Sequence, residues 1–457
     1  MAYNVQPEVI FMSFLHPFKV YFIGICGIST SALALYLTGK NVKVCGSDSC
    51  GGEIAEMLKR GGVDVRIGDG VDENLIDSEL VVYSSAVPEA DERLLYARQN
   101  RKAVLSRAEL LAEICDCYPF SVGVGGTHGK TTVTAMLAHI LKCAEMPFDA
   151  HIGGLDVDFG NIYTGGGERF ITEVCEYKRN IKYFAPSVGV VLNVAPDHLE
   201  SYGGFSALAQ EFIGFATRSG VAVINGDDEV LKNLNGIKFS LKNKKCEYYA
   251  CKIKPRANGF NFTVYERGKK LGRFWVKGIF SHNVLNALAA LAAGRACGVD
   301  KKSVARGLKC FRGVKRREEW LGETNGAKVF ADYCHHPEQI EKTLKALKER
   351  AKGRLITLFQ PHTYSRTASL FEQFVAALSN VSDRTFITAV YAAREEYSEA
   401  GSGRRLCSAV AGAEYIADLK SEIGKVFSCA IKGDVIAVLG AGDVYFYAED
   451  YLRNRLT

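Results

Sequence analysis

Residues 122–132 read V-G-V-G-G-T-H-G-K-T-T and contain the residue types of a phosphate-binding loop. An apolar strand is predicted before it, over Phe120–Val124, and an amphipathic helix after it, over Thr132–Ala144. A glycine-rich turn between a strand and a helix directs backbone N–H groups toward an anion. Lys130 would reach the β- and γ-phosphates of a nucleotide, and the hydroxyl of Thr131 would ligate Mg²⁺. The sequence therefore predicts nucleotide phosphate binding here.

Two further segments place acidic groups and an imidazole after predicted strands. Glu173 falls at the end of the strand predicted over Phe170–Val174, and Asp197-His198 follows the strand predicted over Val188–Val194. The carboxyl ends of parallel strands share one rim with the phosphate loop. These groups could hold Mg²⁺ ions that bridge phosphates, although hard cations prefer oxygen to imidazole. The alternative is an Asp-His pair that caps a helix.

Other polar segments leave alternatives open. Asn286 lies inside an alanine-rich helix predicted over Val284–Ala296, where its amide could bond an adenine edge. Asn283 could do the same or cap that helix. The run 315–317 (K-R-R) suits phosphate binding or a solvated surface equally well.

The segments D-Y-C-H-H-P at 332–337 and Q-P-H-T-Y-S-R-T at 360–367 each follow a predicted strand. Adjacent His335 and His336 are a weak zinc signal, because neighbouring residues on a loop rarely converge on one metal. His362 and Arg366 could bind a carboxylate.

The composition is that of a globular protein with several cores. A length of 457 residues predicts about three domains, and the net charge of +6 is small with no outstanding basic run, so we expect no nucleic acid partner. Fourteen cysteines without metal-ligand spacing predict a reduced, cytoplasmic protein. No apolar stretch is long enough to span a membrane, and residues 1–17 lack the features of a signal peptide.

Strands alternate with helices along most of the chain, which predicts an α/β fold with parallel sheets. The turn G-I-C-G-I-S at 24–29 follows a strand over Lys19–Ile23 and lacks two glycines of the dinucleotide fingerprint. Asp48 ends the next strand, where a carboxylate suits a ribose hydroxyl or a solvated loop. Further strands are predicted over Val42–Cys45, Val63–Ile67, Leu80–Tyr83 and Val221–Ile224, and helices over Thr30–Leu37, Glu53–Arg60 and Arg107–Ile114.

The glycine-rich stretch Asn161–Glu168 is predicted as a surface turn, and Lys232–Lys270 as meandering β structure. A third block starts near Gly313. Its strands are predicted over Lys328–Ala331, Arg354–Leu358, Thr385–Thr388 and Val435–Leu439, and its helices over Pro337–Ala351, Ala368–Leu378 and Asp443–Leu452.

Taken together, these segments resemble the Mur ligase family, the ATP-dependent amide-forming enzymes of peptidoglycan precursor synthesis. G-T-H-G-K-T-T matches its phosphate loop, E-V-C-E-Y and P-D-H-L-E its metal-binding segments, and H-N-V-L-N-A its adenine-binding helix. D-Y-C-H-H-P and F-Q-P-H-T-Y-S-R-T are similar to the alanine-adding branch, and S-S-A-V-P at 84–88 and L-G-A-G-D at 439–443 also fit. Later-acting members carry a carbamylated lysine in the region matching Phe205–Phe215, which has no lysine here.

The resemblance implies three α/β domains. A Rossmann-like UDP-substrate domain would span residues 1–117, a central P-loop ATPase domain with a parallel sheet 118–312, and a Rossmann-like C-terminal domain that closes over the nucleotide 313–457. The implied reaction uses ATP and Mg²⁺ to join L-alanine to UDP-N-acetylmuramate through an acyl phosphate, in a monomer or weak dimer. The alternatives are a sister ligase that attaches a preformed peptide, glycine or serine, and a non-catalytic binding homologue.

The resemblance also implies roles for individual residues. Catalysis would rest on Lys130, Glu173, His198 and Arg317, and Mg²⁺ would bind Thr131, Glu173 and His198. ATP would contact Gly126, Thr127, His128, Gly129, Lys130, Thr131, Thr132, Asn283, Asn286, Arg317 and Asp332. The UDP substrate would contact Gly24, Gly27, Ser29, Asp48, Ser84 and Ser85, and L-alanine would contact Tyr333, His335, His362 and Arg366.

Several positions depart from the family pattern. Cys26 replaces a glycine of the UDP-binding turn, whereas Val124 departs only from the strict phosphate-loop motif, which has its first glycine at that position. Glu318 follows Arg317 where phenylalanine is usual, and its charge could compete for that arginine. Further departures are Asp69 for a common histidine, Thr363 for an arginine of some members, and Ala331 for the first aspartate of a D-D-Y pattern. None removes a residue of the ATPase core.

Overall fold

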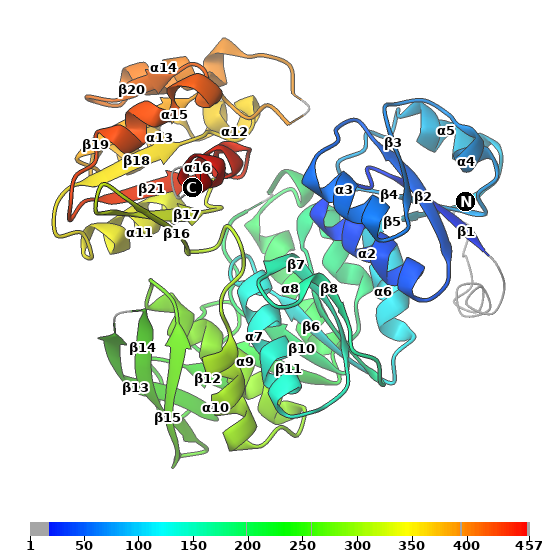
Figure 1. The fold of residues 1–457 in the computed structure, drawn as a ribbon. Coiled ribbons are helices and arrows are strands. Elements are labelled where there is room, and N and C mark those ends of the chain that lie inside the picture. The colour runs from blue at the N-terminus through cyan, green and yellow to red at the C-terminus, as the bar shows by residue number, and fades with distance from the viewer. Residues whose placement is uncertain (1–17, 198, 257, 394, 455–457) are drawn as a thin grey trace. The chain divides into compact units, whose positions relative to one another are not determined.

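The computed structural model describes residues 18–454 except His198, Ala257 and Arg394, and also leaves out the side chain of Glu200. The role predicted for His198 and the prediction that residues 1–17 are not a signal peptide both concern residues outside the described part of the chain. Contacts divide the chain into two compact units. The first runs through Lys277 and includes Ser281–Arg312, and the second contains Gly278–Phe280 and continues from Gly313 (Figure 1).

The first unit begins with a parallel sheet of five strands in the order β3-β2-β1-β4-β5. This order makes the end of β1 a topological switch point, where doubly wound sheets bind ligands. The strands are β1 (Lys19–Ile23), β2 (Lys43–Asp48), β3 (Asp64–Ile67), β4 (Leu80–Tyr83) and β5 (Ala103–Ser106), and the helices are α2 (Ile28–Gly39), α3 (Glu53–Arg60), α4 (Glu73–Ile76), α5 (Glu92–Gln99) and α6 (Arg107–Asp116).

The first unit also contains a sheet of ten strands in the order β15-β14-β13-β12-β11-β10-β6-β9-β7-β8. It is parallel from β7 through β9, β6 and β10 to β13, and antiparallel hairpins extend both edges. The strands are β6 (Phe120–Gly125), β7 (Asp149–Asp156), β8 (Gly160–Thr164), β9 (Arg169–Glu173), β10 (Val188–Val191), β11 (Val221–Asn225), β12 (Ile237–Ser240), β13 (Tyr248–Arg256), β14 (Gly259–Glu266) and β15 (Lys269–Lys277).

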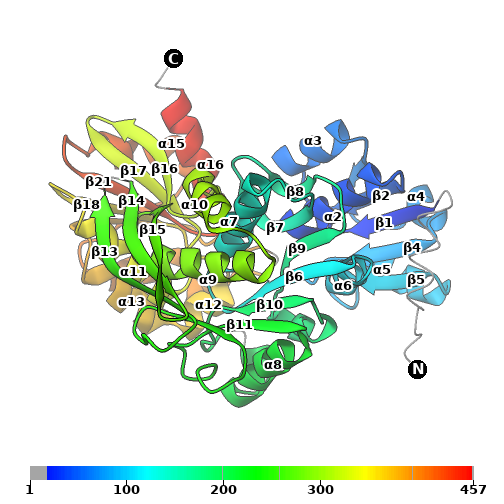
Figure 2. The same ribbon diagram turned by 90° about the horizontal axis from the view of Figure 1, so that it is seen from below.

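Helices α7 (Lys130–Cys143), α9 (His282–Ala296) and α10 (Lys301–Cys310) pack together in this unit, and α8 (Phe205–Arg218) packs against β10 and β11 (Figure 2). Short 3₁₀ helices are η1 (Tyr177–Tyr183) and η2 (Leu199–Ser201). Strand β6 is buried along almost its whole length, as expected for a parallel strand covered on both faces. The buried apolar run and the following glycines therefore place the start of α7 at the rim of the sheet.

The second unit is a mixed sheet of six strands in the order β16-β17-β21-β18-β19-β20, in which only β16 is antiparallel. The strands are β16 (Glu319–Thr324), β17 (Ala327–Asp332), β18 (Leu355–Phe359), β19 (Arg384–Thr388), β20 (Glu414–Ile416) and β21 (Val435–Leu439). The helices are α11 (Pro337–Lys348), α12 (Tyr364–Ser369), α13 (Phe371–Ser379), α14 (Gly403–Ala409), α15 (Leu419–Ser428) and α16 (Val444–Arg453), with the 3₁₀ helix η3 (Glu399–Gly401).

The α/β class and the parallel sheets were predicted correctly, but three local predictions were wrong. Asn161–Glu168 is not only a turn, because β8 pairs with β7 and the Asn161 amide donates to the Ile28 carbonyl of α2 at 2.8 Å. The strand predicted to reach Val194 ends at Val191, since the following backbone pairs with the phosphate loop instead. The helix predicted over Ala368–Leu378 is two helices, separated where Leu370 leaves the helical conformation.

Among the described residues, no helix is both long enough and apolar enough to cross a bilayer.

Candidate functional site

The phosphate loop takes a conformation that needs glycine at two positions. Gly126 has φ +140° and Gly129 has φ +89°, a region that side chains rarely adopt. A Cβ at Gly126 would lie 2.9 Å from the Cβ of Leu192, and one at Gly129 would lie 2.7 Å from Asn286 Oδ1. The glycines thus let the loop approach both the end of β10 and the predicted adenine-binding helix.

The segment after β10 holds the loop in place. The side-chain amide of Asn193 accepts from the His128 N–H at 2.9 Å and donates to the His128 carbonyl at 3.0 Å. The Thr127 N–H donates to the Asn193 carbonyl, and the Thr127 hydroxyl bonds both backbone groups of Ala195. His128 therefore fixes the loop conformation through its backbone, and Thr127 through both its backbone and its hydroxyl. Asn193 was not among the predicted site residues, although a polar residue near the end of an apolar strand is a usable signal.

Lys130 opens α7 and is already engaged within the loop. Its ammonium donates to the carbonyls of Gly126 and Thr127, at 2.5 and 3.2 Å, and to both carboxylate oxygens of Glu176, at 2.8 and 3.1 Å. Burial by itself lowers the pKa of Lys130. The charge of the Glu176 carboxylate opposes this effect, and the pKa of Lys130 is raised above its usual value. Glu176 is only 2% exposed, so it is a buried counter-charge that the sequence analysis did not identify.

Thr131 and Glu173 meet beside this pair. The Thr131 hydroxyl donates to Glu173 Oε2 at 2.7 Å, which joins the first turn of α7 to the end of β9. A hydroxyl and a carboxylate at hydrogen-bond distance are hard oxygen donors of the kind that Mg²⁺ prefers. The residues present therefore fit the metal that was predicted for them.

Gly153 on β7 leaves the space that the Glu173 carboxylate fills, since a Cβ there would lie 1.8 Å from Glu173 Oε1. We expect Gly153→Ala to displace this carboxylate and to raise the Mg²⁺ concentration needed for half-maximal activity by about tenfold or more. Phosphate release measured against Mg²⁺ concentration checks this. Gly39→Ala is the control, because a Cβ at Gly39 meets nothing within 4 Å. An unchanged Mg²⁺ dependence would refute the role of Glu173.

The turn predicted to bind the UDP substrate lies at the end of β1. Gly24 has φ +77° and lies against Ser84, which follows β4, so the switch point brings these predicted residues together. The Asp48 carboxylate is 8% exposed and accepts the N–H groups of Cys26 and Cys50. Asp48 is therefore not a solvated loop residue, because it holds the turn.

Other predicted residues of this turn have varied partners. Gly27 precedes α2, and the Ser29 hydroxyl lies 2.7 Å from His151 Nε2 of the central sheet. Burial lowers the pKa of His151 to about 3, so this imidazole is neutral. The Ser85 carbonyl accepts from Lys178 at 2.8 Å. Burial raises the pKa of the Cys26 thiol to about 12, so the thiol that replaces glycine here stays protonated at neutral pH.

The two asparagines of α9 lie together. The Asn286 amide donates to Asn283 Oδ1 at 3.1 Å, and Asn286 Oδ1 faces the loop at Gly129. The amide pair is thus adjacent to the phosphate loop. Thr132 follows the two loop residues that begin α7.

The basic run 315–317 in the second unit is not uniform. The Arg316 guanidinium is buried among the rings of Tyr333, Tyr445 and Phe446 and donates to the Gly442 carbonyl at 2.5 Å. Burial lowers the pKa of Arg316. Arg316 is thus a structural residue, whereas Arg317 lies over the Tyr333 ring at 5.0 Å.

Asp332 ends β17 and is a largely buried carboxylate. Its two oxygens accept the N–H groups of Glu318 and Cys334, at 3.0 and 2.9 Å. Burial raises the pKa of Asp332, and the positive charge of Arg317 opposes that shift. The residues predicted for ribose and for the γ-phosphate therefore lie next to each other.

Glu318 has a structural role that the sequence did not reveal. Its carboxylate accepts the N–H groups of Ile279 and Phe280, at 2.8 and 3.2 Å, and so ties the segment 278–280 to β16. The residue has φ +47°, in the left-handed region.

Replacing Glu318 tests this role. We expect Glu318→Ala to lower the free energy of unfolding of the second unit by about 1–3 kcal/mol, because two buried N–H groups lose their acceptor. Glu318→Gln should cost less, because its amide oxygen still accepts. Thermal unfolding of both variants checks this, and equal stability of the alanine variant and the unchanged chain would contradict it.

The residues predicted for L-alanine form a continuous group. The ring centroids of Tyr333 and His335 lie 5.5 Å apart, and those of His335 and His362 lie 5.9 Å apart. Arg366 on α12 donates to His362 Nδ1 at 3.2 Å, and Tyr391 stacks on His362 at 5.7 Å. The sequence analysis did not identify Tyr391. The group combines a guanidinium with aromatic walls and can hold a small amino acid by its carboxylate.

Burial keeps both imidazoles of this group neutral. It lowers the pKa of His335 to about 3 and that of His362 to about 4, with the charge of Arg366 adding to both shifts. The His335 Nδ1–H therefore donates to the Tyr333 carbonyl at 3.0 Å, and His362 Nδ1 accepts from Arg366.

These shifts predict a pH-dependent stability. These histidines have a lower pKa in the folded protein than in the unfolded protein, where it is about 6.5. Above that pH both states are neutral and the folded protein keeps its full stability. As the pH falls toward the folded pKa, the unfolded state binds a proton that the folded state does not, and the free energy of unfolding decreases. We expect His335 to contribute a slope of up to about 1.4 kcal/mol per pH unit below about pH 6. Hydrogen exchange of the β21 amides at pH 7 and pH 5 measures this. In His335→Asn the pH dependence should be shallower, and an equal dependence would contradict the assignment.

Known proteins match this chain over nearly its full length. Three family models match in order: the Mur ligase family catalytic domain over residues 19–118, the Mur ligase middle domain over 124–294, and the Mur ligase glutamate ligase domain over 316–442. The UDP-N-acetylmuramate–L-alanine ligase of Clostridium acetobutylicum is 35% identical over 95% of this chain and 98% of its own. The enzyme of the same name from Acetivibrio thermocellus is 37% identical over 97% of this chain and 98% of its own.

Solved structures agree with these sequence matches. The UDP-N-acetylmuramate–alanine ligase of Thermotoga maritima has a TM-score of 0.84 at 27% identity, covering 96% of this chain and 99% of that one. A murein peptide ligase from Psychrobacter arcticus has the same fold, with a TM-score of 0.74 at 23% identity over 95% of this chain and 98% of that one. The chain belongs to the Mur ligase family.

Proposed function

We propose that this chain is an ATP-dependent ligase that joins L-alanine to UDP-N-acetylmuramate, in the synthesis of peptidoglycan precursors. The observation that carries the proposal is the end-to-end similarity to ligases of that name, at 35–37% identity over at least 95% of the chain. The arrangement of Tyr333, His335, His362 and Arg366 in one group supports the amino-acid part of the reaction.

The phosphate loop would hold ATP. Lys130 would exchange the Glu176 carboxylate for the γ-phosphate and would stabilise negative charge on the transferring phosphoryl group. Gly126, Thr127, His128 and Gly129 would direct backbone N–H groups at the phosphates. Bound Mg²⁺ would let the anionic substrate carboxylate and the γ-phosphate approach each other. Thr131 and Glu173 would hold one ion, and Glu173 and His198 would hold a second.

The other residues would bind and orient the reactants. In the first unit the amides of Asn283 and Asn286 would contact adenine, and the β1 turn with Ser84 and Ser85 would bind the UDP moiety. In the second unit Asp332 would bind the ribose and Arg317 the γ-phosphate. Arg366 would hold the L-alanine carboxylate, which leaves the amine to attack the acyl phosphate that forms on the sugar nucleotide. The predicted boundaries at residues 117/118 and 312/313 would separate the three functions.

The second candidate is a sister ligase that attaches a preformed peptide to the same sugar nucleotide. The reason to test this candidate is that the murein peptide ligase from Psychrobacter arcticus has a similar fold. An acceptor competition separates the two. L-alanine, glycine, serine and a tripeptide are supplied singly and together with ATP, Mg²⁺ and UDP-N-acetylmuramate, and the products are resolved by mass spectrometry. Exclusive formation of the alanine adduct supports the proposal, and preferential ligation of the tripeptide overturns it.

A further inference from the structure

The chain concentrates its positive charge in one segment of the first unit. Residues 231–277 contain 13 of the 57 Lys and Arg residues but only two of the 51 Asp and Glu residues, a net charge of +11 in a chain whose total is +6. This segment forms β12 to β15, the meandering end of the central sheet (Figures 1 and 2). The small net charge of the whole chain does not reveal this basic segment, so the expectation that no basic run stands out was wrong.

Both carboxylates of this segment are already engaged. Glu247 accepts the Lys238 N–H at 2.9 Å. Glu266 pairs with Arg295 at the end of α9, at 3.0 Å, and accepts from the Tyr248 hydroxyl at 2.7 Å. Lys232 pairs with Glu229, which lies just before the segment. Most other cations of the segment form no ion pair in the part of the chain that the structure describes.

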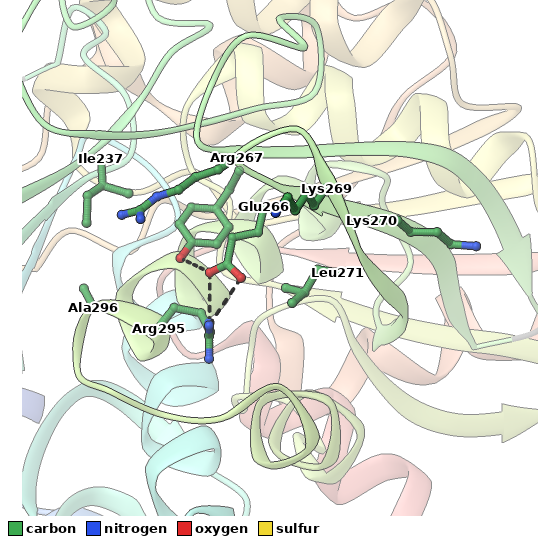
Figure 3. Close-up of a pocket in the computed structure, with 9 residues that line it drawn as sticks. Ile237, Glu266, Arg267, Lys269, Lys270, Leu271, Arg295 and Ala296 are labelled. Atoms are coloured by element: carbon green, nitrogen blue, oxygen red, sulfur yellow. Dashed lines mark hydrogen bonds and ion pairs between the residues drawn. The ribbon is translucent and has the colours of Figure 1, made fainter.

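A cavity of about 510 Å³ opens among these cations (Figure 3). Its lining residues are Ile237, Tyr248, Glu266, Arg267, Lys269, Lys270, Leu271, Arg295 and Ala296. Glu266 and Arg295 face each other at its centre, and the ammonium of Lys270 points away from this pair. Its size is within the usual range of small-molecule sites.

Arg267 and Lys269 supply uncommitted charge to the cavity. No side-chain hydrogen bond or ion pair within 4 Å joins either of them to another residue in the part of the chain that the structure describes. Arg267 has φ +47° and Gly268 φ +77°, so they form a two-residue turn between β14 and β15. Asn-Gly is the preferred pair at such a turn, and arginine is strained there. The chain thus keeps a cation at a position where its backbone would favour asparagine.

We propose that this cavity binds a small phosphate-bearing polyanion at a site separate from the substrates. Arg267 and Lys269 would contact the phosphates, and Ile237, Leu271 and Ala296 would cover the less polar part of the ligand. Arg295 lies about 18 Å along α9 from Asn283, by the helical rise of 1.5 Å per residue. The site is therefore distinct from the proposed adenine contact. A concave wall with a few apolar residues favours a small molecule over a flat polymer surface.

Calorimetric titration of inorganic tripolyphosphate into the full chain tests the proposal. The pocket variant is Arg267→Asn with Lys269→Ala, in which asparagine suits the turn and should not weaken the fold. The matched control is Lys254→Ala with Arg256→Ala, which removes the same charge from exposed positions on β13 outside the cavity. Phosphate release without added ligand should be unchanged in both, because none of the four residues belongs to the proposed reaction.

The unchanged chain and the control should bind one more equivalent of tripolyphosphate than the pocket variant, or bind it at least about tenfold more tightly at that site. This affinity should fall with added salt. Equal binding by all three proteins would overturn the proposal. The second contradicting result would be that both double variants weaken the binding of a single-stranded oligonucleotide equally and that neither changes the binding of tripolyphosphate. That result would overturn the proposal in favour of a diffuse surface for polyanions.

Discussion

Replacing Lys130 by alanine is expected to lower phosphate release by about 10²–10³-fold, because the variant loses a preorganised cation at the transferring phosphoryl group. The same change should destabilise the first unit by about 3–5 kcal/mol, since it leaves the Glu176 carboxylate buried without its partner. Steady-state phosphate release and urea unfolding measure the two effects separately.

A second substitution separates these two roles of Lys130. In Lys130→Ala with Glu176→Gln the buried charge is gone, so most of the lost stability should return while phosphate release stays low. Recovery of activity in the double variant would show that the single variant failed through misfolding, and that the lysine does not act on phosphate.

Replacing Arg366 by alanine should raise the KM for L-alanine by roughly 10- to 100-fold with a smaller change in the KM for ATP. The guanidinium would otherwise form a charge-assisted hydrogen bond with the amino-acid carboxylate, a contact that contributes about 1.5–3 kcal/mol. Its hydrogen bond to His362 Nδ1 also orients the imidazole, so Arg366→Lys should recover only part of the loss.

Initial rates at varied L-alanine and varied ATP check this prediction. Arg453→Ala is the control, since Arg453 is an exposed residue at the end of α16 that pairs with Glu449. Equal increases in the KM for both substrates would contradict the assignment of Arg366 to the amino acid.

The sequence predicted best the elements whose apolar runs end in strong turn residues. β1, β4, β21 and α3 have their predicted bounds, because each run is bordered by Gly, Asp or Ser. The same signal predicted β6 and α7 and so placed the phosphate loop, although β6 extends one residue beyond the predicted strand and α7 begins two residues before the predicted helix.

Residues that act through long-range pairing could not be assigned in this way. Glu176 contacts Lys130 from 46 residues away, and His151 contacts Ser29 from 122 residues away. Adjacent Arg316 and Arg317 have the same chemistry in the sequence, and only the packing of the aromatic rings distinguishes the buried structural arginine from its neighbour. Glu318 was predicted to compete for Arg317. Its actual partners, the N–H groups of residues 279 and 280, belong to a segment distant in the sequence and could not be inferred from it.

The most direct test of the central claim is phosphate release from ATP and Mg²⁺ with each reactant omitted in turn. We expect release to require both UDP-N-acetylmuramate and L-alanine, with formation of a stoichiometric amount of the amide product. Folded protein that binds ATP but releases no phosphate with L-alanine, glycine, serine or a tripeptide would contradict it and would indicate a binding homologue.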